Sequence, residues 1–351
     1  MMKCAHSRQS ENGVARVGFI YLGRSPAFGS FVVELAEAVQ RRSDLRAYFI
    51  VASGTPMVER LVGTGADVFL VDTFYRSNLA RVAFGLPKAR REIGRKLRAE
   101  PPDAVVTLMP HIWSPLLRGR IKSLTSTYAT IVHDATPHPG DPTAHLTRWL
   151  VQDARKADVV LTLSQAVTRQ LSTNSWLDSS RVQTLFHPDL LSGGKPMVRR
   201  LDSGRAFRLL FFGRIMAYKG LDQLLDAADL LAQEGLRIEL GVAGLGSLGP
   251  FRERLEQMGA MIANRWLDVD EVGALLQDYD AMACSHVEAS QSGVAALAFG
   301  NAMPVIGMPV GGIAEQVIDG ETGVLTADVS AVGLADAIRR LIRQEGLYER
   351  I

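Results

Sequence analysis

Residues 207–244 read FRLLFFGRIMAYKGLDQLLDAADLLAQEGLRIELGVAG, and this stretch decides the fold class. A short apolar run ends at Gly213, a run with helical spacing begins at Gly220, and a second apolar run ends at Gly244. Short apolar runs that alternate with helical segments are typical of β-α-β units with a buried parallel sheet. We therefore predict a parallel α/β sheet in this half of the chain.

The same alternation extends outward from this stretch in both directions. Upstream, the apolar runs are RVGFIYL, RAYFIVA, DVFLV, DAVVTLM, YATIVHD and DVVLTLS, and downstream they are GAMIAN and DAMACS. A chain of 351 residues exceeds the size at which one hydrophobic core keeps growing. The predicted class is α/β, with two Rossmann-like doubly wound parallel sheets that face each other across a cleft.

The segment between the two series lacks any sustained period and carries Gly, Pro and basic residues, as linkers do. We predict a disordered leader at residues 1–13, an amino-terminal domain at 14–190, a linker at 191–205, and a carboxyl-terminal domain at 206–330. The helix predicted at 331–351 is expected to pack back on the amino-terminal domain.

Composition excludes several classes of protein. Hydrophobic residues make up 47% and charged residues 22% of the chain, which indicates a globular protein instead of a disordered one. A net charge of +2 does not indicate a nucleic-acid partner. Cys4 and Cys284 form neither a disulfide framework nor a metal-ligand pattern, which favours the reducing cytoplasm. No apolar run approaches the length of a membrane-spanning helix.

Two cations stand at the turn between the strand and the helix of the opening stretch. Arg214 follows Gly213 directly, and Lys219 comes just before the helix. Arg binds phosphate oxygens through two N–H groups, Lys adds a point charge, and a helix amino terminus favours anions. We predict a diphosphate site here, and the alternative is a pair of solvated surface cations.

The glycine-rich segment VAGLGSLG has the G-x-G-x-x-G spacing, with Gly244 and Gly246 as its first two glycines. Such spacing after a strand suggests a dinucleotide cofactor. The acids that follow, Asp268 and Asp270, stand where a helix N-cap is expected. A nucleotide-facing loop of another kind is therefore preferred, and an NAD-dependent oxidoreductase stays as an alternative.

These features recur in order with EASQSGVAALAFGNAMPVIGMPVGG (residues 288–312) and VIDGETGVL. The second half of the chain resembles the family 4 retaining nucleotide-sugar glycosyltransferases, which have the GT-B fold. The resemblance is close over most of residues 207–326 and looser in the first domain. It implies that Arg214 and Lys219 bind the donor diphosphate and that Glu288 contacts the donor sugar. The implied donor-binding backbone positions are Gly213, Gly244, Gly246, Ser292, Gly293 and Val294.

One position departs from the family pattern. Most members carry a second Glu eight residues after the first, usually credited with holding the ribose, whereas here that residue is Ala296. The loop containing Glu288 is also longer than usual. Ribose recognition would then come from another group or from the main chain. Capping of a core helix is the structural alternative for the segment around Ser292.

In the first domain, TIVHDATPHPGD ends a strand with His133 and Asp134 and continues with His138 and Asp141. The resemblance places His133 near the transferred sugar. A metal site is an alternative because imidazole and carboxylate are its usual ligands, but the spacing fits no standard pattern. Gly29 is expected to open a helix and to contact the donor.

The segment KARREIGRKLR (residues 88–98) runs from Lys88 to Arg98 and holds six basic residues on a predicted helix. Such a face attracts anionic phospholipid headgroups, and a solvated charged face is the alternative. Since many family members use lipid-linked acceptors, we expect contact with the inner face of the membrane.

The resemblance implies a metal-independent, retaining hexosyltransferase without a cofactor. We expect a UDP- or GDP-linked sugar as donor, a glycan or lipid-linked acceptor, and a role in surface polysaccharide or glycolipid synthesis. A binding protein that has lost turnover is the second hypothesis, because the second acid is missing at Ala296.

Overall fold

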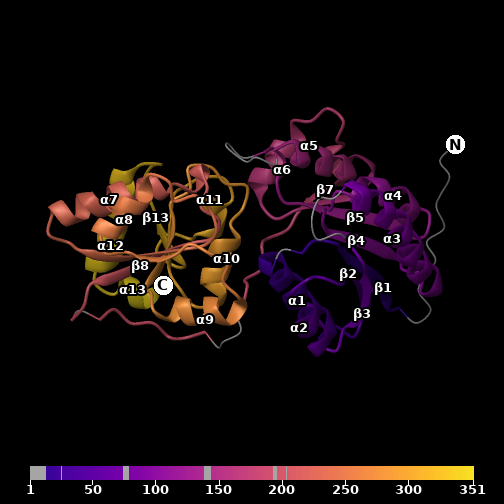
Figure 1. Cartoon of the computed structure of the whole chain (residues 1–351), viewed down its shortest axis with the longest axis horizontal. Coiled ribbons are helices and arrows are strands. Elements are labelled where there is room, and N and C mark those ends of the chain that lie inside the picture. Colours follow the sequence, from indigo (N-terminus) through magenta and orange to yellow (C-terminus); the bar gives the residue numbers. More distant parts are fainter. Residues whose placement is uncertain (1–12, 25, 74–78, 138–143, 193–195, 203) are drawn as a thin grey trace. The chain divides into compact units, whose positions relative to one another are not determined.

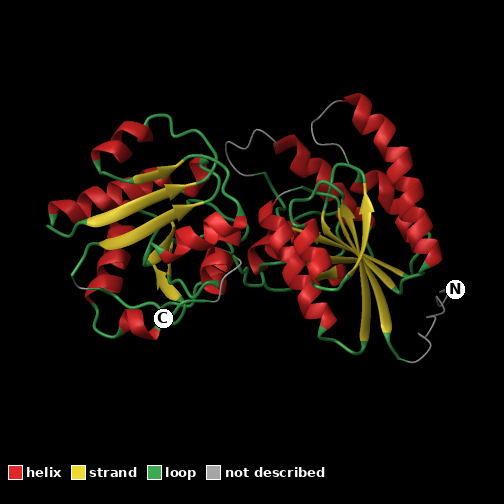
Figure 2. Ribbon diagram, turned by 60° about the horizontal axis from the view of Figure 1, so that its bottom comes forward, coloured by secondary structure: helices red, strands yellow, loops and turns green. Residues whose placement is uncertain are grey.

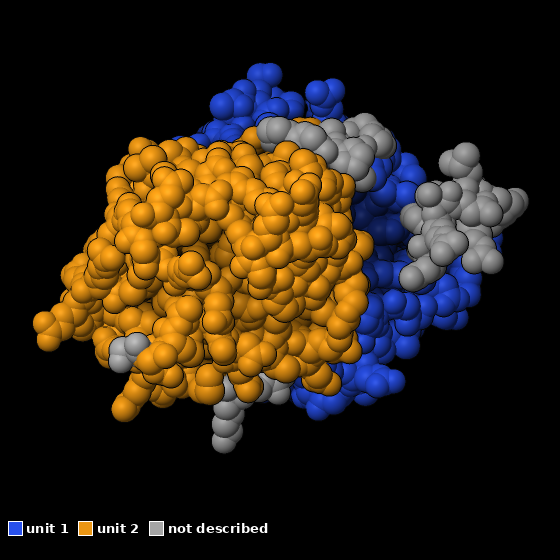
Figure 3. All heavy atoms as spheres, turned by 60° about the vertical axis from the view of Figure 1, so that its left-hand side comes forward, with its two compact units in different colours: residues 1–136, 143–163, 168–185 blue, residues 137–142, 164–167, 186–351 orange. Residues whose placement is uncertain are grey.

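The computed structural model describes residues 13–24, 26–73, 79–137, 144–192, 196–202 and 204–351. The chain divides into two compact units (Figure 3). Unit 1 comprises residues 1–136, 143–163 and 168–185. Unit 2 comprises residues 137–142, 164–167 and 186–351.

Unit 1 is built on a parallel sheet with the strand order β3-β2-β1-β4-β5-β6-β7. The strands are β1 (Ala15–Tyr21), β2 (Leu45–Ala52), β3 (Asp67–Val71), β4 (Ala104–Met109), β5 (Thr127–Val132), β6 (Val159–Thr162) and β7 (Val182–Thr184). The helices are α1 (Pro26–Gln40), α2 (Val58–Gly63), α3 (Leu79–Ala99), α4 (Ser114–Lys122), α5 (Ala144–Leu150) and α6 (Gln165–Ser172), with 3-10 turns η1 (Val151–Lys156) and η2 (Ser179–Arg181).

Unit 2 repeats the plan with the order β10-β9-β8-β11-β12-β13, again all parallel. The strands are β8 (Phe207–Phe212), β9 (Ile238–Ala243), β10 (Met261–Ala263), β11 (Ala281–Cys284), β12 (Val305–Gly307) and β13 (Gly323–Leu325). The helices are α7 (Leu221–Gln233), α8 (Phe251–Gln257), α9 (Val269–Gln277), α10 (Gly293–Gly300), α11 (Ile313–Gln316), α12 (Ala331–Arg343) and α13 (Leu347–Arg350), with the 3-10 turn η3 (Ala217–Lys219) (Figure 1).

The central strands of unit 2 bury both faces, which explains their continuous apolar sequence. In β8, Leu209 and Phe211 join the core cluster that holds α7 and α12, whereas Leu210 joins the opposite cluster with α9 and α10. Side chains alternate between the faces of a strand, so a sheet covered on both sides needs apolar residues at every position. Figure 2 shows helices on both sides of each sheet. The predicted pair of doubly wound α/β domains is confirmed.

The last helix differs from the expectation. We expected residues 331–351 to pack back on the amino-terminal domain, but α12 packs against α7 in unit 2. Leu334, Ile338 and Leu341 are completely buried in the unit 2 core. These residues lie at i, i+4 and i+7, which forms one apolar stripe along the helix.

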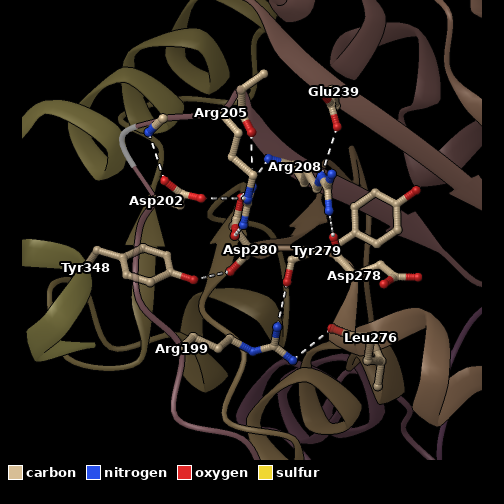
Figure 4. Close-up of polar contacts among 12 residues, drawn as sticks. Arg199, Asp202, Arg205, Arg208, Glu239, Leu276, Asp278, Tyr279, Asp280 and Tyr348 are labelled. Atoms are coloured by element: carbon tan, nitrogen blue, oxygen red, sulfur yellow. Dashed lines mark hydrogen bonds and ion pairs between the residues drawn. The ribbon is translucent and has the colours of Figure 1, made fainter.

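The segment predicted as a linker is bound to unit 2 along much of its described length (Figure 4). Arg199 donates hydrogen bonds to the carbonyl oxygens of Tyr279 at 2.6 Å and Leu276 at 2.8 Å. Arg205 binds the buried carboxylate of Asp280, with Nη1 2.7 Å from Oδ2. Side-chain anchoring of this kind produces no helical or strand period in the sequence.

Helix α1 begins earlier than predicted. We expected Gly29 to open this helix, but α1 begins at Pro26. Proline suits the first helical position because the backbone N–H that it lacks would have no partner within the helix. Gly29 instead lies inside the helix, where a Cβ atom would be 2.4 Å from Cγ of Met57. Its small size lets α1 approach this side chain.

Candidate functional site

The centre of the unit 2 sheet lies between β8 and β11. Strand order reverses here, because β9 and β10 extend the sheet on one side and β11 to β13 extend it on the other. In open parallel sheets, ligands bind beyond the carboxyl ends of the strands at such a switch point. Gly213 and Arg214 follow β8 directly, and His286 and Glu288 follow β11. The predicted diphosphate-binding and sugar-binding segments therefore begin at neighbouring strand ends.

The glycine-rich loop after β9 packs on the loop after β8. The amide of Gly213 donates to the carbonyl oxygen of Ala243 at 2.9 Å, and the amide of Ile215 donates to the carbonyl oxygen of Leu245 at 2.9 Å. A Cβ atom on Gly244 would lie 1.9 Å from the carbonyl oxygen of Gly213. One on Gly246 would lie 2.3 Å from that of Ile215. Close backbone packing thus explains these two glycines without a dinucleotide.

Lys219 lies at the end of η3, just before α7. Gly220 follows with φ +66°, and a Cβ atom there would be 1.9 Å from the carbonyl oxygen of Ser285. The hydroxyl of Ser285 donates to the carbonyl oxygen of Lys219 at 3.1 Å, and the amide of Val287 donates to that of Tyr218 at 2.9 Å. These contacts fix the lysine turn against the segment that follows β11.

The two predicted phosphate-binding cations differ in their surroundings. Arg214 is exposed, and its side chain has no ion pair or hydrogen bond with any residue in the described ranges. Lys219 is half-buried, and its Nζ lies 2.8 Å from Nε2 of His286. Arg214 is therefore available to an incoming anion, whereas Lys219 is held in place by the protein.

Helix α10 begins in the segment that follows β11, a few residues after Glu288. Ser292 is its N-cap, and its hydroxyl accepts from the amide of Ala295 at 3.2 Å. The backbone of Ser292 is also bound by Gln316, which accepts from the Ser292 amide at 2.8 Å and donates to its carbonyl oxygen at 3.1 Å. The amides of Gly293 and Val294, in contrast, have no acceptor among the residues that the structure describes. They can donate to an anionic ligand.

The side chain of Val294 lies beside Gly213, where an added Cβ atom would approach it to 3.2 Å. The start of α10 is therefore next to the end of β8. Glu288 is half-buried in the loop between β11 and α10. Burial raises the pKa of the thiol of Cys284, which ends β11, to about 11 although Lys219 opposes the rise. This cysteine is a neutral core residue.

Unit 1 also has a switch point, between β1 and β4. Arg24 follows β1, and its Nε donates to the hydroxyl of Thr73 at 3.1 Å. The guanidinium lies so close to Gly54 that a Cβ atom there would be 2.4 Å from Nη1. His111 follows β4, and burial, together with the charge of Arg24, lowers its pKa to about 4. These residues place a cation and a neutral imidazole at this sheet edge.

His133 follows β5, as predicted, and is buried. Its Nε2 lies 2.9 Å from the carbonyl oxygen of Leu108, to which it must donate, so Nδ1 is the nitrogen left unprotonated. Burial lowers the pKa of this imidazole. The Phe28 ring contacts it edge-on, with centroids 4.9 Å apart. A small cavity adjoins His133 and Asp134. His138 and Asp141 lie outside the described residues.

Two family models match this chain in tandem. "Glycosyl transferase 4-like domain" matches residues 28–185, and "Glycosyl transferases group 1" matches residues 206–344. The chain is a family 4 glycosyltransferase.

Individual relatives have low sequence identity to this chain, but the matches cover most of both proteins. Alpha-D-kanosaminyltransferase of Streptomyces kanamyceticus is 24% identical, and the match covers 80% of this chain and 77% of that protein. D-inositol 3-phosphate glycosyltransferase of a Nocardioides species is 24% identical, and the match covers 96% of this chain and 84% of that protein. The crystal structure of Anabaena HepE in complex with UDP has a TM-score of 0.67 at 15% identity and covers 95% of this chain and 92% of that chain. The likeness confirms the GT-B fold.

Family membership replaces the dehydrogenase interpretation of the glycine spacing. Asp268, which could have been mistaken for a ribose-binding acid, is the N-cap of α9, as predicted, and it forms a capping box with Glu271. Asp270 lies in the first turn of the helix instead. In this glycosyltransferase Ala296 is buried, and its carbonyl oxygen accepts from the amide of Leu190 at 3.0 Å. The position of the missing second acid therefore serves to pack α10.

Sequence reasoning missed three polar residues near these strand ends: His111, His286 and Gln316. The two histidines each follow a predicted strand, and that position was a usable signal for both. Gln316 gave no signal, because its partner Ser292 is 24 residues away in the sequence.

Proposed function

We propose that this glycosyltransferase transfers a sugar from a UDP- or GDP-linked donor to a glycan or lipid-linked acceptor, with retention at the anomeric carbon. The observation that carries the proposal is that two cations and two backbone N–H groups, which the described residues leave unpaired, come together at the unit 2 switch point. The segment after β8 supplies Arg214 and Lys219, and the start of α10 supplies the amides of Gly293 and Val294. Two cations and a helix amino terminus suit a diphosphate.

In this mechanism negative charge builds on the leaving diphosphate as the glycosidic bond breaks. Charges and amides that are already oriented stabilise this state without reorganisation. Lys219 is oriented by the contacts of its turn, and Arg214 completes the site by binding phosphate oxygens through its planar guanidinium. The residues present can stabilise the leaving group by themselves, which supports metal-independent transfer.

Glu288 of unit 2 would contact the donor sugar. In unit 1, the neutral imidazole of His133 offers Nδ1 as an acceptor. The acceptor would attack from the leaving-group face, and the departing phosphate would take its proton. Neither sequence nor structure provides a second carboxylate at position 296, which fits a reaction without a dedicated protein base.

The compared proteins support the donor class. HepE was crystallised with UDP. Both relatives are named as enzymes that transfer a sugar: one as a kanosaminyltransferase, the other as a D-inositol 3-phosphate glycosyltransferase. The first name states the transferred sugar and the second the acceptor, so they leave the proposed glycan or lipid-linked acceptor to experiment. We place the reaction in surface polysaccharide or glycolipid synthesis.

The basic helix α3 supports contact with an anionic membrane on the cytoplasmic side. Lys88 and Lys96 are engaged in ion pairs, with Asp72 at 2.6 Å and Asp67 at 2.9 Å respectively. The remaining basic residues of the segment are exposed: Arg90, Arg91, Arg95 and Arg98. Residues 91, 95 and 98 follow each other at i, i+4 and i+7, so they form one basic stripe. The described part of the chain contains no helix long and apolar enough to span a bilayer.

A thermal-shift screen tests the donor site. UDP, GDP, ADP and their sugars are added to the unmodified protein and to Arg214→Ala and Lys219→Ala. We expect UDP or GDP to raise the melting temperature of the unmodified protein and to have a reduced effect on both variants. If no nucleotide diphosphate raises it, the proposed donor site is wrong. NMR of the anomeric proton in the product then distinguishes retention from inversion.

A catalytically impaired binding protein is the second candidate, favoured by Ala296 at the position of the usual second acid. It predicts nucleotide binding without transfer or hydrolysis of the donor. Release of UDP or GDP from the sugar nucleotide, measured in the presence of candidate acceptors, separates the two.

A further inference from the structure

His286 lies next to the lysine of the donor site and has no role in the function proposed so far. It follows β11, its side chain is only 2% exposed, and its Nε2 lies 2.8 Å from Nζ of Lys219. The ring of Tyr218 flanks the pair, with its centroid 5.6 Å from Nζ and 6.3 Å from the centroid of the His286 ring.

The chemistry of the two groups determines the direction of this hydrogen bond. A lysine ammonium has three N–H donors and no acceptor, so Nε2 of His286 must be unprotonated and must accept. The imidazole is then neutral and carries its proton on Nδ1. An imidazolium could not accept this bond. This contact uses one N–H group of the ammonium, so it does not itself prevent the other two from donating to phosphate oxygens.

Backbone contacts fix the positions of the Lys219 and His286 side chains relative to each other. The Ser285 hydroxyl binds the carbonyl oxygen of Lys219, and the Val287 amide binds that of Tyr218, so the residues on both sides of His286 contact the lysine turn. Gly220 lets this turn approach the carbonyl oxygen of Ser285. The imidazole therefore meets the ammonium from a fixed direction, and a flexible four-carbon side chain loses conformational freedom before any ligand arrives.

We propose that His286 is a positioning residue: its neutral imidazole accepts a hydrogen bond from Lys219 and directs the ammonium toward the leaving diphosphate. This role rests on the proposed function, and it assigns to His286 an effect that acts through Lys219. Pre-orientation raises catalytic efficiency because the charge is in place when the transition state forms.

The test compares His286→Gln, whose side-chain oxygen can accept at the position of Nε2, with His286→Leu, which has a similar volume and no acceptor. We expect His286→Leu to lower kcat and the affinity for UDP or GDP about tenfold or more, as for loss of one hydrogen bond to a charged group. We expect His286→Gln to recover most of both. Equal impairment of the two variants, or unchanged kinetics in His286→Leu, would overturn the role.

A double-mutant cycle with Lys219→Met separates positioning from a general structural effect. Dissociation constants for UDP and GDP are measured by calorimetry for the two single variants and the double variant. If His286 acts through Lys219, His286→Leu weakens binding no further in the Lys219→Met protein. Additive losses would overturn the role of His286 alone, whereas absence of UDP and GDP binding by the unmodified protein would overturn the donor site on which it depends.

A measurement on the unmodified protein covers the case in which the variants fail to fold. Nitrogen-15 NMR of labelled histidines identifies the protonated ring nitrogen. An unprotonated Nε2 and a protonated Nδ1 on His286 at neutral pH support the proposal. The opposite tautomer, or an imidazolium, contradicts it.

Discussion

The backbone of Gly244 lies so close to Gly213 that a Cβ atom on residue 244 would be 1.9 Å from the Gly213 carbonyl oxygen. Gly244 also has φ +139°, which side chains of L-residues rarely adopt. The glycine-rich loop after β9 and the loop after β8 therefore share one packed arrangement. Arg214 extends from the second of these loops, so its position depends on glycines thirty residues later in the chain.

Gly244→Ala should destabilise the protein and weaken donor binding together. Adding a Cβ atom requires movement of the Gly213 backbone, and we expect a loss of about 2 kcal/mol or more in the free energy of unfolding. Urea denaturation measures the stability, and calorimetry with UDP or GDP measures the affinity. Gly119→Ala is the control, because residue 119 is helical and a Cβ atom there has no neighbour within 4 Å. It should gain about 0.5–1 kcal/mol; an equal loss in both variants would contradict the packing argument.

Asp280→Ala should destabilise unit 2 without affecting donor affinity. The carboxylate accepts from the Arg205 guanidinium and from the Arg208 amide at 2.8 Å, at the edge of the sheet opposite the strand ends that hold the donor site. Its removal leaves partly buried donors of Arg205 and Arg208 unpaired, and we expect a loss of about 2–3 kcal/mol in the free energy of unfolding. Asp278→Ala is the matched control, because the Asp278 side chain is exposed. A wild-type urea midpoint for Asp280→Ala would refute this account.

Protein stability should fall as the pH is lowered from about 6.5, and His111 should contribute to the fall. Its pKa in the folded protein is about 4, because burial and Arg24 disfavour the imidazolium, whereas an unfolded histidine has a pKa of about 6.5. Between these values the unfolded chain binds more protons, so acid favours unfolding. The contribution is complete above pH 6.5 and is lost on acidification toward pH 4. The lowered pKa of the buried His133 acts with the same sign.

His111→Asn should reduce this pH dependence. The Asn side-chain oxygen can replace Nδ1 as acceptor for the Trp113 amide, which lies 3.3 Å from Nδ1. Urea midpoints measured from pH 7 to pH 4 would show the difference between the two proteins. Identical slopes would mean that His111 is protonated as readily in the folded protein as in the unfolded chain.

Reversing charge on α3 should weaken binding to anionic vesicles. We expect Arg91→Glu with Arg95→Glu to lower partitioning into phosphatidylglycerol-containing vesicles by about thirtyfold or more, since about 1 kcal/mol is lost with each arginine and the new carboxylates add repulsion. Co-sedimentation measures the effect. The control is Arg237→Glu with Arg343→Glu, which changes the net charge equally at exposed positions of unit 2. If both double variants bind alike, the attraction is a property of net charge, and α3 is no membrane face.

The fold was accessible from the sequence because the evidence for it is local. Apolar runs such as residues 207–213 and the helical spacing after Gly220 predict β-α-β order without reference to distant residues. The capping of α9 by Asp268 was likewise readable from neighbouring residues. The anchoring of the predicted linker to unit 2 was not readable from the sequence, because Arg199 and Arg205 bind groups about eighty residues away and local composition does not indicate such contacts.

The sequence by itself determined two parallel-sheet domains and placed Arg214, Lys219 and Glu288 next to strand ends. Those assignments need only periodicity and the rule that parallel strands end at one edge of a sheet. Tertiary structure decided which groups support them: Gly244 against Gly213, Gln316 on the backbone of Ser292, and His286 on Lys219. These partners are far apart in the chain, and only strand order and register bring them into contact.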